Sequence, residues 1–249
     1  MEDLAAVAAE LADWGRADGI SGIAMRGQRG VGICEWTWPC FLRSFGGSYY
    51  RDYPDDRTPA LDSDEAIEAL QFYVDLLSAA GPAGAASYGP TEVLNDLMAG
   101  KTAMVLDSAT LGTSAENPEK STVAGKLGYA MVPQGPAGRH PGFYTWAISV
   151  PAGSSRAEDG GAFAAWMISP EVAVEVGFSA PNQALENTYN FPRYEGYAQA
   201  QSCLEALMAS LEIADPDYRP RNAQAQEIGD IVSVAVSEAV SGQVSPAEA

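Results

Sequence analysis

The chain has 249 residues, 47% of them hydrophobic, and carries 33 acidic against 14 basic side chains, a formal net charge of −19. This length suffices for a substantial core in one large or two small domains, while the negative charge disfavours nucleic acid and anionic membrane surfaces as partners. No apolar run approaches the roughly 20 residues of a membrane-spanning helix, so we expect no membrane span in this chain.

The first segment of the chain predicts a helix, a strand and a long loop. Residues 2–15 place apolar side chains on one helical face, with acidic residues in the first turn. Residues 20–25 alternate weakly, as a short strand does. Residues 31–47 crowd aromatic side chains around a proline and predict a loop. This loop holds three candidate ligand residues, Glu35, Trp36 and Trp38.

Residues 61–81 carry the clearest helical pattern of the sequence. Apolar side chains recur at the spacing of one helix face. Asp62 can cap the N-terminus, with Glu65 three residues later, and Gly81 followed by Pro82 ends the helix.

The stretch 91–107, TEVLNDLMAGKTAMVLD, predicts a helix that ends at Gly100 and is followed by a short buried strand. The strand ends in Asp107, with Ser108 and Thr110 just beyond it. An open α/β sheet usually holds its ligand outside the carboxyl ends of its strands, so these side chains are candidates for a binding site. The alternative is an ordinary core strand whose aspartate caps a turn.

The middle of the chain predicts an irregular segment and two further strands. Residues 111–126 are polar and irregular, and residues 127–132 read as a strand. Residues 142–150 alternate as a strand with two different faces, one of which carries Tyr144 and Trp146.

The C-terminal part predicts helices. Ser155 and Glu158 form a capping box for a helix that buries Phe163, Trp166 and Met167.

Three more helical patterns follow, over residues 169–177, 204–211 and 228–239. Arg221 and Asn222 lie just before the last of these helices, where Asn222 is also a candidate N-cap. Helices outnumber strands and separate them, which indicates α/β architecture with parallel or mixed sheets.

The order of these features resembles extracellular solute-binding proteins of sugar importers, and the polyol and sugar binders among them most of all. The resemblance covers nearly the whole chain and rests on several weak signals in one order. Those signals are Gly100-Lys101 with Ala103-Met104, Gly128-Tyr129 with Val132-Pro133, Pro151, Ser154-Ser155, Trp166, Ser169-Pro170-Glu171 and Gly242.

The resemblance implies a partial periplasmic-binding-protein-like (type II) two-lobe α/β fold. Residues 1–127 would form the first part of the C-terminal lobe, residues 128–178 the remnant of the N-terminal lobe, and residues 179–249 the closing helices of the C-terminal lobe. It also implies a non-enzymatic, cofactor-free substrate-binding component of an ABC importer, located in the periplasm or on the cell surface. Such a monomer captures a sugar or polyol between its lobes, closes by a hinge and delivers the solute to permease subunits.

A sugar or polyol site combines aromatic faces, which pack on C–H surface, with planar polar groups that satisfy hydroxyls. The residues expected to provide these are Glu35, Trp36, Trp38, Asp107, Tyr144, Trp146, Arg221 and Asn222. Packing in the core is the alternative role of the tryptophans.

The N-terminus shows no signal segment, since Met1 leads straight into a helical pattern. In the family, further strands and helices precede the helix that residues 4–14 resemble. We therefore expect a partial version of the protein, which on its own binds ligand weakly or not at all and tends to aggregate. An intact intracellular protein is the alternative.

Enzyme signatures are weak. Gly100-Lys101-Thr102 lacks the spacing of a phosphate loop, and the order helix then strand is the reverse of what that loop needs. The only histidine, His140, has no serine in a nucleophile elbow to activate. With 33 acids, two carboxylates flanking one glycosidic bond remain open, so a fragment of a carbohydrate-active enzyme of the glycoside hydrolase type is the runner-up.

The three cysteines, Cys34, Cys40 and Cys203, form no metal-binding pattern. Cys34 and Cys40 either pair in an oxidising compartment or stay free.

Overall fold

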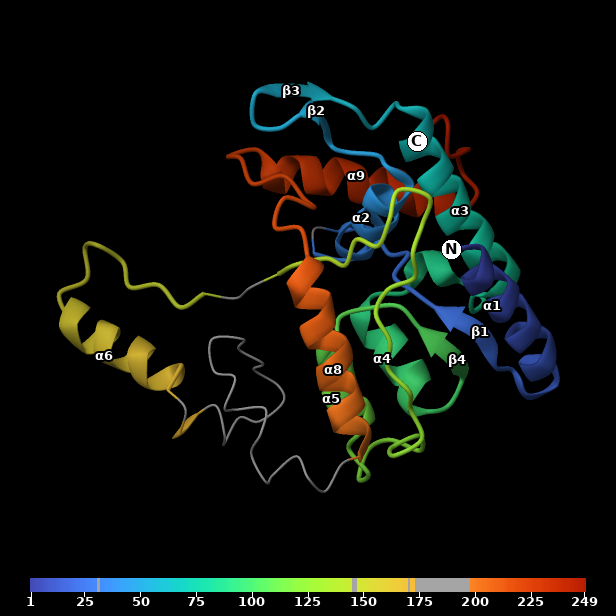
Figure 1. The fold of residues 1–249 in the computed structure, drawn as a ribbon, viewed down its shortest axis with the longest axis horizontal. Coiled ribbons are helices and arrows are strands. Elements are labelled where there is room, and N and C mark those ends of the chain that lie inside the picture. Colours follow the sequence, from blue (N-terminus) through green and yellow to red (C-terminus); the bar gives the residue numbers. More distant parts are fainter. Residues whose placement is uncertain (31, 145–146, 170, 173–197) are drawn as a thin grey trace.

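A computed structural model describes residues 1–30, 32–144, 147–169, 171–172 and 198–249 (Figure 1). Its helices and strands follow one another in a mixed α/β order. They are α1 Glu2–Gly15, β1 Ser21–Ala24, α2 Cys34–Phe45, β2 Tyr50–Asp52, β3 Asp56–Pro59, α3 Asp64–Ala80, α4 Pro90–Met98, β4 Thr102–Val105, α5 Thr110–Ala115, α6 Ala157–Met167, α8 Ala198–Ile213 and α9 Ala225–Val240.

Two small sheets lie within the described residues. β1 and β4 pair in parallel, with Ile23 opposite Met104, and α4 leads into β4 through Gly100 in the left-handed conformation (φ 68°). This confirms the predicted helix, turn and strand of residues 91–107, and the predicted strand at residues 20–25. β2 and β3 form an antiparallel hairpin that the sequence analysis did not predict.

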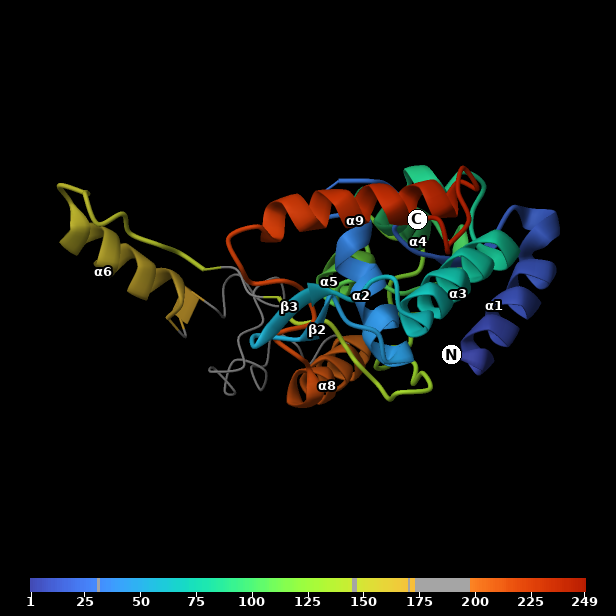
Figure 2. The same cartoon turned by 90° about the horizontal axis from the view of Figure 1, so that it is seen from above.

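The main core lies between β1 and helices α1, α2, α3 and α9. Figure 2 shows α9 lying across α2, with α3 and α1 beside them. Phe41, Tyr73 and Ile23 are among the largest fully buried side chains, and the Phe41 and Tyr73 rings meet edge to face at 5.0 Å. Packing of these helix faces buries apolar area and fixes α2 against α3 and α9.

The loop predicted for residues 31–47 is wrong, because residues 34–45 form α2. Pro39 lies inside this helix, where it cannot donate a hydrogen bond to the carbonyl of Glu35. The helix persists because most of its residues are buried, so that tertiary packing outweighs the roughly 3 kcal/mol that proline costs in a helix interior. Gly46, with φ 97°, ends the helix.

Helix α3 confirms the clearest predicted helix but has a different cap. Ser63, not Asp62, is the N-cap, and its Oγ accepts a hydrogen bond from the Ala66 N–H at 3.3 Å. Asp62 is exposed.

We expect Ser63→Ala to lower the free energy of unfolding by about 1 kcal/mol, because it leaves a helix N–H without its cap. Asp62→Ala is the matched control and should change it by only a few tenths. Urea unfolding followed by circular dichroism measures both. A larger effect at Asp62 than at Ser63 would contradict the observed cap.

The segment between β4 and α6 differs from its prediction. Residues 110–115 form α5 rather than irregular chain, and residues 127–132 are not a strand. The described part of residues 142–150 has one isolated bridge, Gly142 to Asp215, and no strand. A strand needs a hydrogen-bonded neighbour, and none runs beside these residues in the described part of the chain.

Helix α6 lies apart from the other described helices, as both views show (Figures 1 and 2). Phe163 and Trp166 are more than half exposed, so the prediction that they are buried is wrong. The N-cap is Arg156 without a side-chain hydrogen bond, so the capping box of Ser155 is wrong too. A local sequence pattern predicts that a helix forms, whereas burial depends on a packed partner.

Helices α8 and α9 confirm the last two helical patterns, and Gly242 (φ 74°) follows α9. Most of the short helix predicted from residue 169 lies outside the described residues. No helix in the described part of the chain is long and apolar enough to cross a bilayer.

Candidate functional site

An arginine stacked among aromatic rings connects the start of α2 with the segment between α8 and α9. The guanidinium carbon of Arg219 lies 4.8 Å from the ring centroid of Trp36 and 5.6 Å from that of Tyr144. The Trp36 and Tyr144 centroids are 4.3 Å apart, with the rings tilted by 38°. Tyr218 adds a third ring at 5.3 Å. We call Arg219, Glu35, Trp36 and Tyr144 the arginine–aromatic cluster.

Glu35 holds this arginine in place. Arg219 Nη1 donates to both carboxylate oxygens of Glu35, at 3.0 and 3.2 Å, and the Glu35 side chain is only 3% exposed. Glu35 Oε1 also accepts the Gly32 N–H at 2.7 Å. Glu35 lies in the first turn of α2, where the helix dipole favours a negative charge.

Several buried polar atoms around the cluster lack a hydrogen-bond partner among the described residues. They include two donors in the cluster itself, Trp36 Nε1 and Arg219 Nε, and nearby Asn222 Oδ1. A buried polar group without a partner costs free energy. A ligand with many hydroxyl groups can satisfy both kinds of atom, since each hydroxyl donates and accepts.

The segment that carries Arg219 is held at both ends, by α2 at one end and by β2 at the other. Asp215 accepts from Arg43 Nη2 at 3.0 Å and bridges to Gly142, which places the Tyr144 segment beside it. At the other end, Asn222 Nδ2 donates to the Tyr50 hydroxyl at 2.7 Å.

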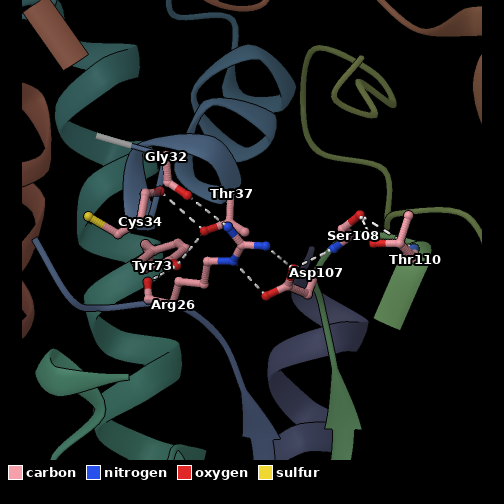
Figure 3. A network of polar contacts seen from close by, with 8 residues as sticks. All are labelled: Arg26, Gly32, Cys34, Thr37, Tyr73, Asp107, Ser108 and Thr110. Carbon is pink, nitrogen blue, oxygen red and sulfur yellow. Dashed lines mark hydrogen bonds and ion pairs between the residues drawn. The ribbon is translucent and has the colours of Figure 1, made fainter. Parts of the chain in front are cut away.

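Asp107 lies in a separate buried network at the ends of β1 and β4, shown in Figure 3. Its carboxylate accepts two hydrogen bonds from Arg26, one of them from Nε at 2.8 Å. The Asp107 side chain is 0% exposed and that of Arg26 6%. Arg26 Nη1 also donates to the Gly32 carbonyl at 3.1 Å, and its own carbonyl accepts from Tyr73.

Gly32 therefore joins the two networks. Its carbonyl binds Arg26 and its N–H binds Glu35, in a left-handed conformation (φ 83°) that favours glycine. The ion pair at the sheet edge thus holds Gly32 (Figure 3), whose N–H in turn binds Glu35.

The structure brings together only some of the eight predicted site residues. Glu35, Trp36 and Tyr144 lie in the arginine–aromatic cluster. Glu35 and Trp36 are on α2 rather than in the predicted loop, and Tyr144 does not lie in the predicted strand. Trp38 is buried in the core against Tyr49, at 6.4 Å between centroids.

The other predicted residues have different surroundings. Asp107 binds Arg26, exposed Arg221 pairs with Asp217, and Asn222 binds Tyr50. Trp146 lies outside the described residues. Arg219 was missed, although a basic residue beside Tyr218 in a loop close to Arg221 is a detectable signal.

A surface hollow of about 560 Å³ lies at the start of α9. Exposed polar side chains, among them Gln226, Glu227 and Asp230, line it without an aromatic wall. The arginine–aromatic cluster, by contrast, combines aromatic rings with a few placed polar groups, as small-molecule sites usually do. Among the described residues, no group of three or more metal-binding side chains comes together.

The three thiols are free and buried, so Cys34 and Cys40 do not form a disulfide. Burial raises the pKa of Cys34 to about 12 and those of Cys40 and Cys203 to about 11, from an ordinary value of 9.0. Thiols that stay protonated and buried are poor nucleophiles.

We expect these thiols to make the fold less stable in alkali. The thiols of the unfolded chain lose their protons near pH 9, whereas those of the native chain keep them up to about pH 11 or 12. The free energy of unfolding therefore falls as pH rises from 9 to about 12. Iodoacetamide at pH 8.5 should label all three thiols in urea and almost none in the native chain. Rapid native labelling would contradict the buried, protonated state.

The comparisons with known proteins all lead to solute-binding proteins. The family described as "Bacterial extracellular solute-binding protein" matches residues 1–174. A mannitol-binding protein of Pseudomonas aeruginosa is 30% identical, over 92% of this chain and 55% of the relative. A probable amino-acid ABC transporter periplasmic-binding protein of Sinorhizobium fredii is 23% identical, over 94% of this chain and 51% of that relative. This chain thus spans about half the length of these curated relatives.

The fold is similar to that of solved solute-binding proteins. The structure of an ABC transporter solute-binding protein from Agrobacterium radiobacter in complex with ribitol matches with a TM-score of 0.87 and 24% identity, over 99% of this chain and 61% of that chain. The match confirms the predicted α/β, two-lobe periplasmic-binding-protein-like fold class.

Proposed function

Because the chain belongs to the bacterial extracellular solute-binding protein family, we propose that it acts as the substrate-binding component of an ABC importer and captures a sugar or polyol. The captured solute would then pass to permease subunits in the membrane. Family membership also supports a location outside the cytoplasmic membrane, in the periplasm or on the cell surface.

The arginine–aromatic cluster is the observation that carries this proposal. Trp36 and Tyr144 pack on each other and on Arg219, and Tyr144 stays 43% exposed, so aromatic surface remains for the C–H groups of a polyol. Trp36 Nε1 and Arg219 Nε are buried donors without a partner among the described residues, ready to bind hydroxyl oxygens. The similarity to a mannitol-binding protein and to a ribitol complex favours a linear polyol.

We further propose that the site closes by a hinge between two lobes. Residues 1–127 and 179–249 would belong to one lobe and residues 128–178 to the other. The isolated bridge from Gly142 to Asp215 brings Tyr144 from the second group against Arg219 from the first, so residues of both groups meet at the cluster. A ligand held by residues of both lobes stabilises the closed state.

A carbohydrate-active enzyme is the weaker reading. Glycoside hydrolysis needs two carboxyl groups flanking the scissile bond, roughly 5–9 Å apart. In the arginine–aromatic cluster, the carboxylate of Glu35 is engaged by Arg219 and Gly32, which leaves it poorly placed as a nucleophile or proton donor.

A thermal-shift screen tests the proposal, since a ligand that binds the native state raises the melting temperature by mass action. The panel contains mannitol, ribitol, maltose and a control amino acid, with this chain and any longer form that its gene encodes. We expect a polyol to raise the melting temperature of at least the longer form and to be recovered unchanged. No shift with either form, a shift with the amino acid alone, or cleavage of the sugar would overturn the proposal.

A further inference from the structure

The positive charge in the arginine–aromatic cluster is balanced within the cluster itself. Arg219 donates to both carboxylate oxygens of Glu35, and the Glu35 side chain is 3% exposed against 21% for Arg219. A charge pair in a poorly solvated site interacts strongly, so an incoming ligand meets both charges together.

The same balance extends along the segment that carries Arg219. Arg43 pairs with Asp215, and Arg221 pairs with Asp217. Three arginines thus pair with three carboxylates on this segment and on α2, so these six charges cancel. The chain as a whole has a net charge of −19, which repels anions over longer distances.

The donors of the cluster that lack a partner among the described residues belong to an uncharged indole and to an arginine whose charge Glu35 already balances. Arg219 directs Nη1 at Glu35, and its Nε lacks a partner among the described residues, as does Trp36 Nε1. A single N–H donor such as Trp36 Nε1 matches a hydroxyl oxygen. A carboxylate gains most from a guanidinium whose positive charge is not already balanced, whereas Glu35 balances that of Arg219.

From these contacts we propose that Glu35 is a specificity-determining residue, which makes the site selective for uncharged polyols over sugar acids of the same length. The inference rests on the proposed function, because it names which ligands that site accepts. Glu35 acts by neutralising Arg219, so removing its charge should open the site to anions.

The test compares Glu35→Gln with the wild type by calorimetric titration of mannitol and mannonate, which differ only in the carboxylate at one end. Glutamine keeps an oxygen that accepts the Gly32 N–H but loses the negative charge. We expect the ratio of mannonate to mannitol affinity to rise by about tenfold or more in the variant. This gain should shrink as salt is added, because it is electrostatic.

Asp217→Asn is the matched control. It removes one negative charge from the same segment but at Arg221, which is exposed. The affinity ratio should then stay within about twofold of the wild type, since exposed ion pairs contribute little.

Each outcome decides between the two proposals. Wild type that binds mannitol, with an unchanged ratio in Glu35→Gln, overturns the role of Glu35 and leaves the proposed function standing. An equal rise of the affinity ratio in Glu35→Gln and Asp217→Asn shows a general charge effect and also overturns the role of Glu35. The titrations use the form of the protein that responds to a polyol in the thermal-shift screen, where failure of the proposed function would already show. Wild type that binds mannonate as tightly as mannitol contradicts the selectivity, and binding of neither overturns it while leaving other sugars and polyols to the proposed function.

Discussion

Replacing Asp107 with asparagine is expected to lower the free energy of unfolding by about 3–5 kcal/mol, the cost of removing one partner from a buried ion pair. The Arg26 guanidinium would lose the charged acceptor of two of its hydrogen bonds, while its side chain stays buried at 6% exposure. Water cannot replace the lost carboxylate there without opening the contact between β1 and β4.

Urea unfolding measures this loss, and Asp13→Asn is the control. Asp13 pairs with Arg16 on the surface of α1, where both side chains are more than 70% exposed. Breaking that pair should change the free energy of unfolding by less than about 1 kcal/mol. Equal effects at the two sites would show that burial does not strengthen the Arg26–Asp107 pair.

This ion pair also explains why Asp107 was a reasonable but incomplete prediction. A polar residue at the end of a buried strand has the same sequence signature whether it binds a ligand or a neighbouring strand. Asp107 binds Arg26, 81 residues away, and is connected to the candidate site through Arg26 and Gly32. A direct ligand role for Asp107 stays a prediction and would require the pair to open.

Elements whose signals are local were predicted well. The helix at residues 91–98, its glycine stop and the following strand depend on neighbouring residues, and so does the pattern of α9. Helix α2 was missed because Pro39 is a strong local signal against a helix, whereas its stability comes from contacts with α3 and α9.

The site was predicted in its residue types more than in its geometry. Aromatic residues and a carboxylate near position 35 were expected from the chemistry of sugar binding. Arg219 was not, because its pairing with Glu35 spans 184 residues and leaves no periodic pattern in the sequence. Of the two predicted tryptophans on α2, only Trp36 faces Arg219, since Trp38 points into the core.

That difference leads to the largest expected effect on binding. Trp36→Ala should weaken polyol binding by about 100-fold, because the ring is both the face under Arg219 and the partner of Tyr144. Trp36→Phe should cost about tenfold, since it keeps a ring face but removes the Nε1 donor. It should not lower the melting temperature much, because that donor has no partner among the described residues.

Calorimetric titration with the polyol found by thermal shift measures both variants. Trp14→Ala is the control, because Trp14 is 70% exposed on α1 and should leave affinity unchanged. Trp38→Phe separates core packing from ligand contact: it should alter stability more than affinity. If Trp38→Phe reduced the affinity and Trp36→Phe did not, the ligand would lie deeper in α2 than the arginine–aromatic cluster, and that cluster would be a structural clamp on the segment before α9.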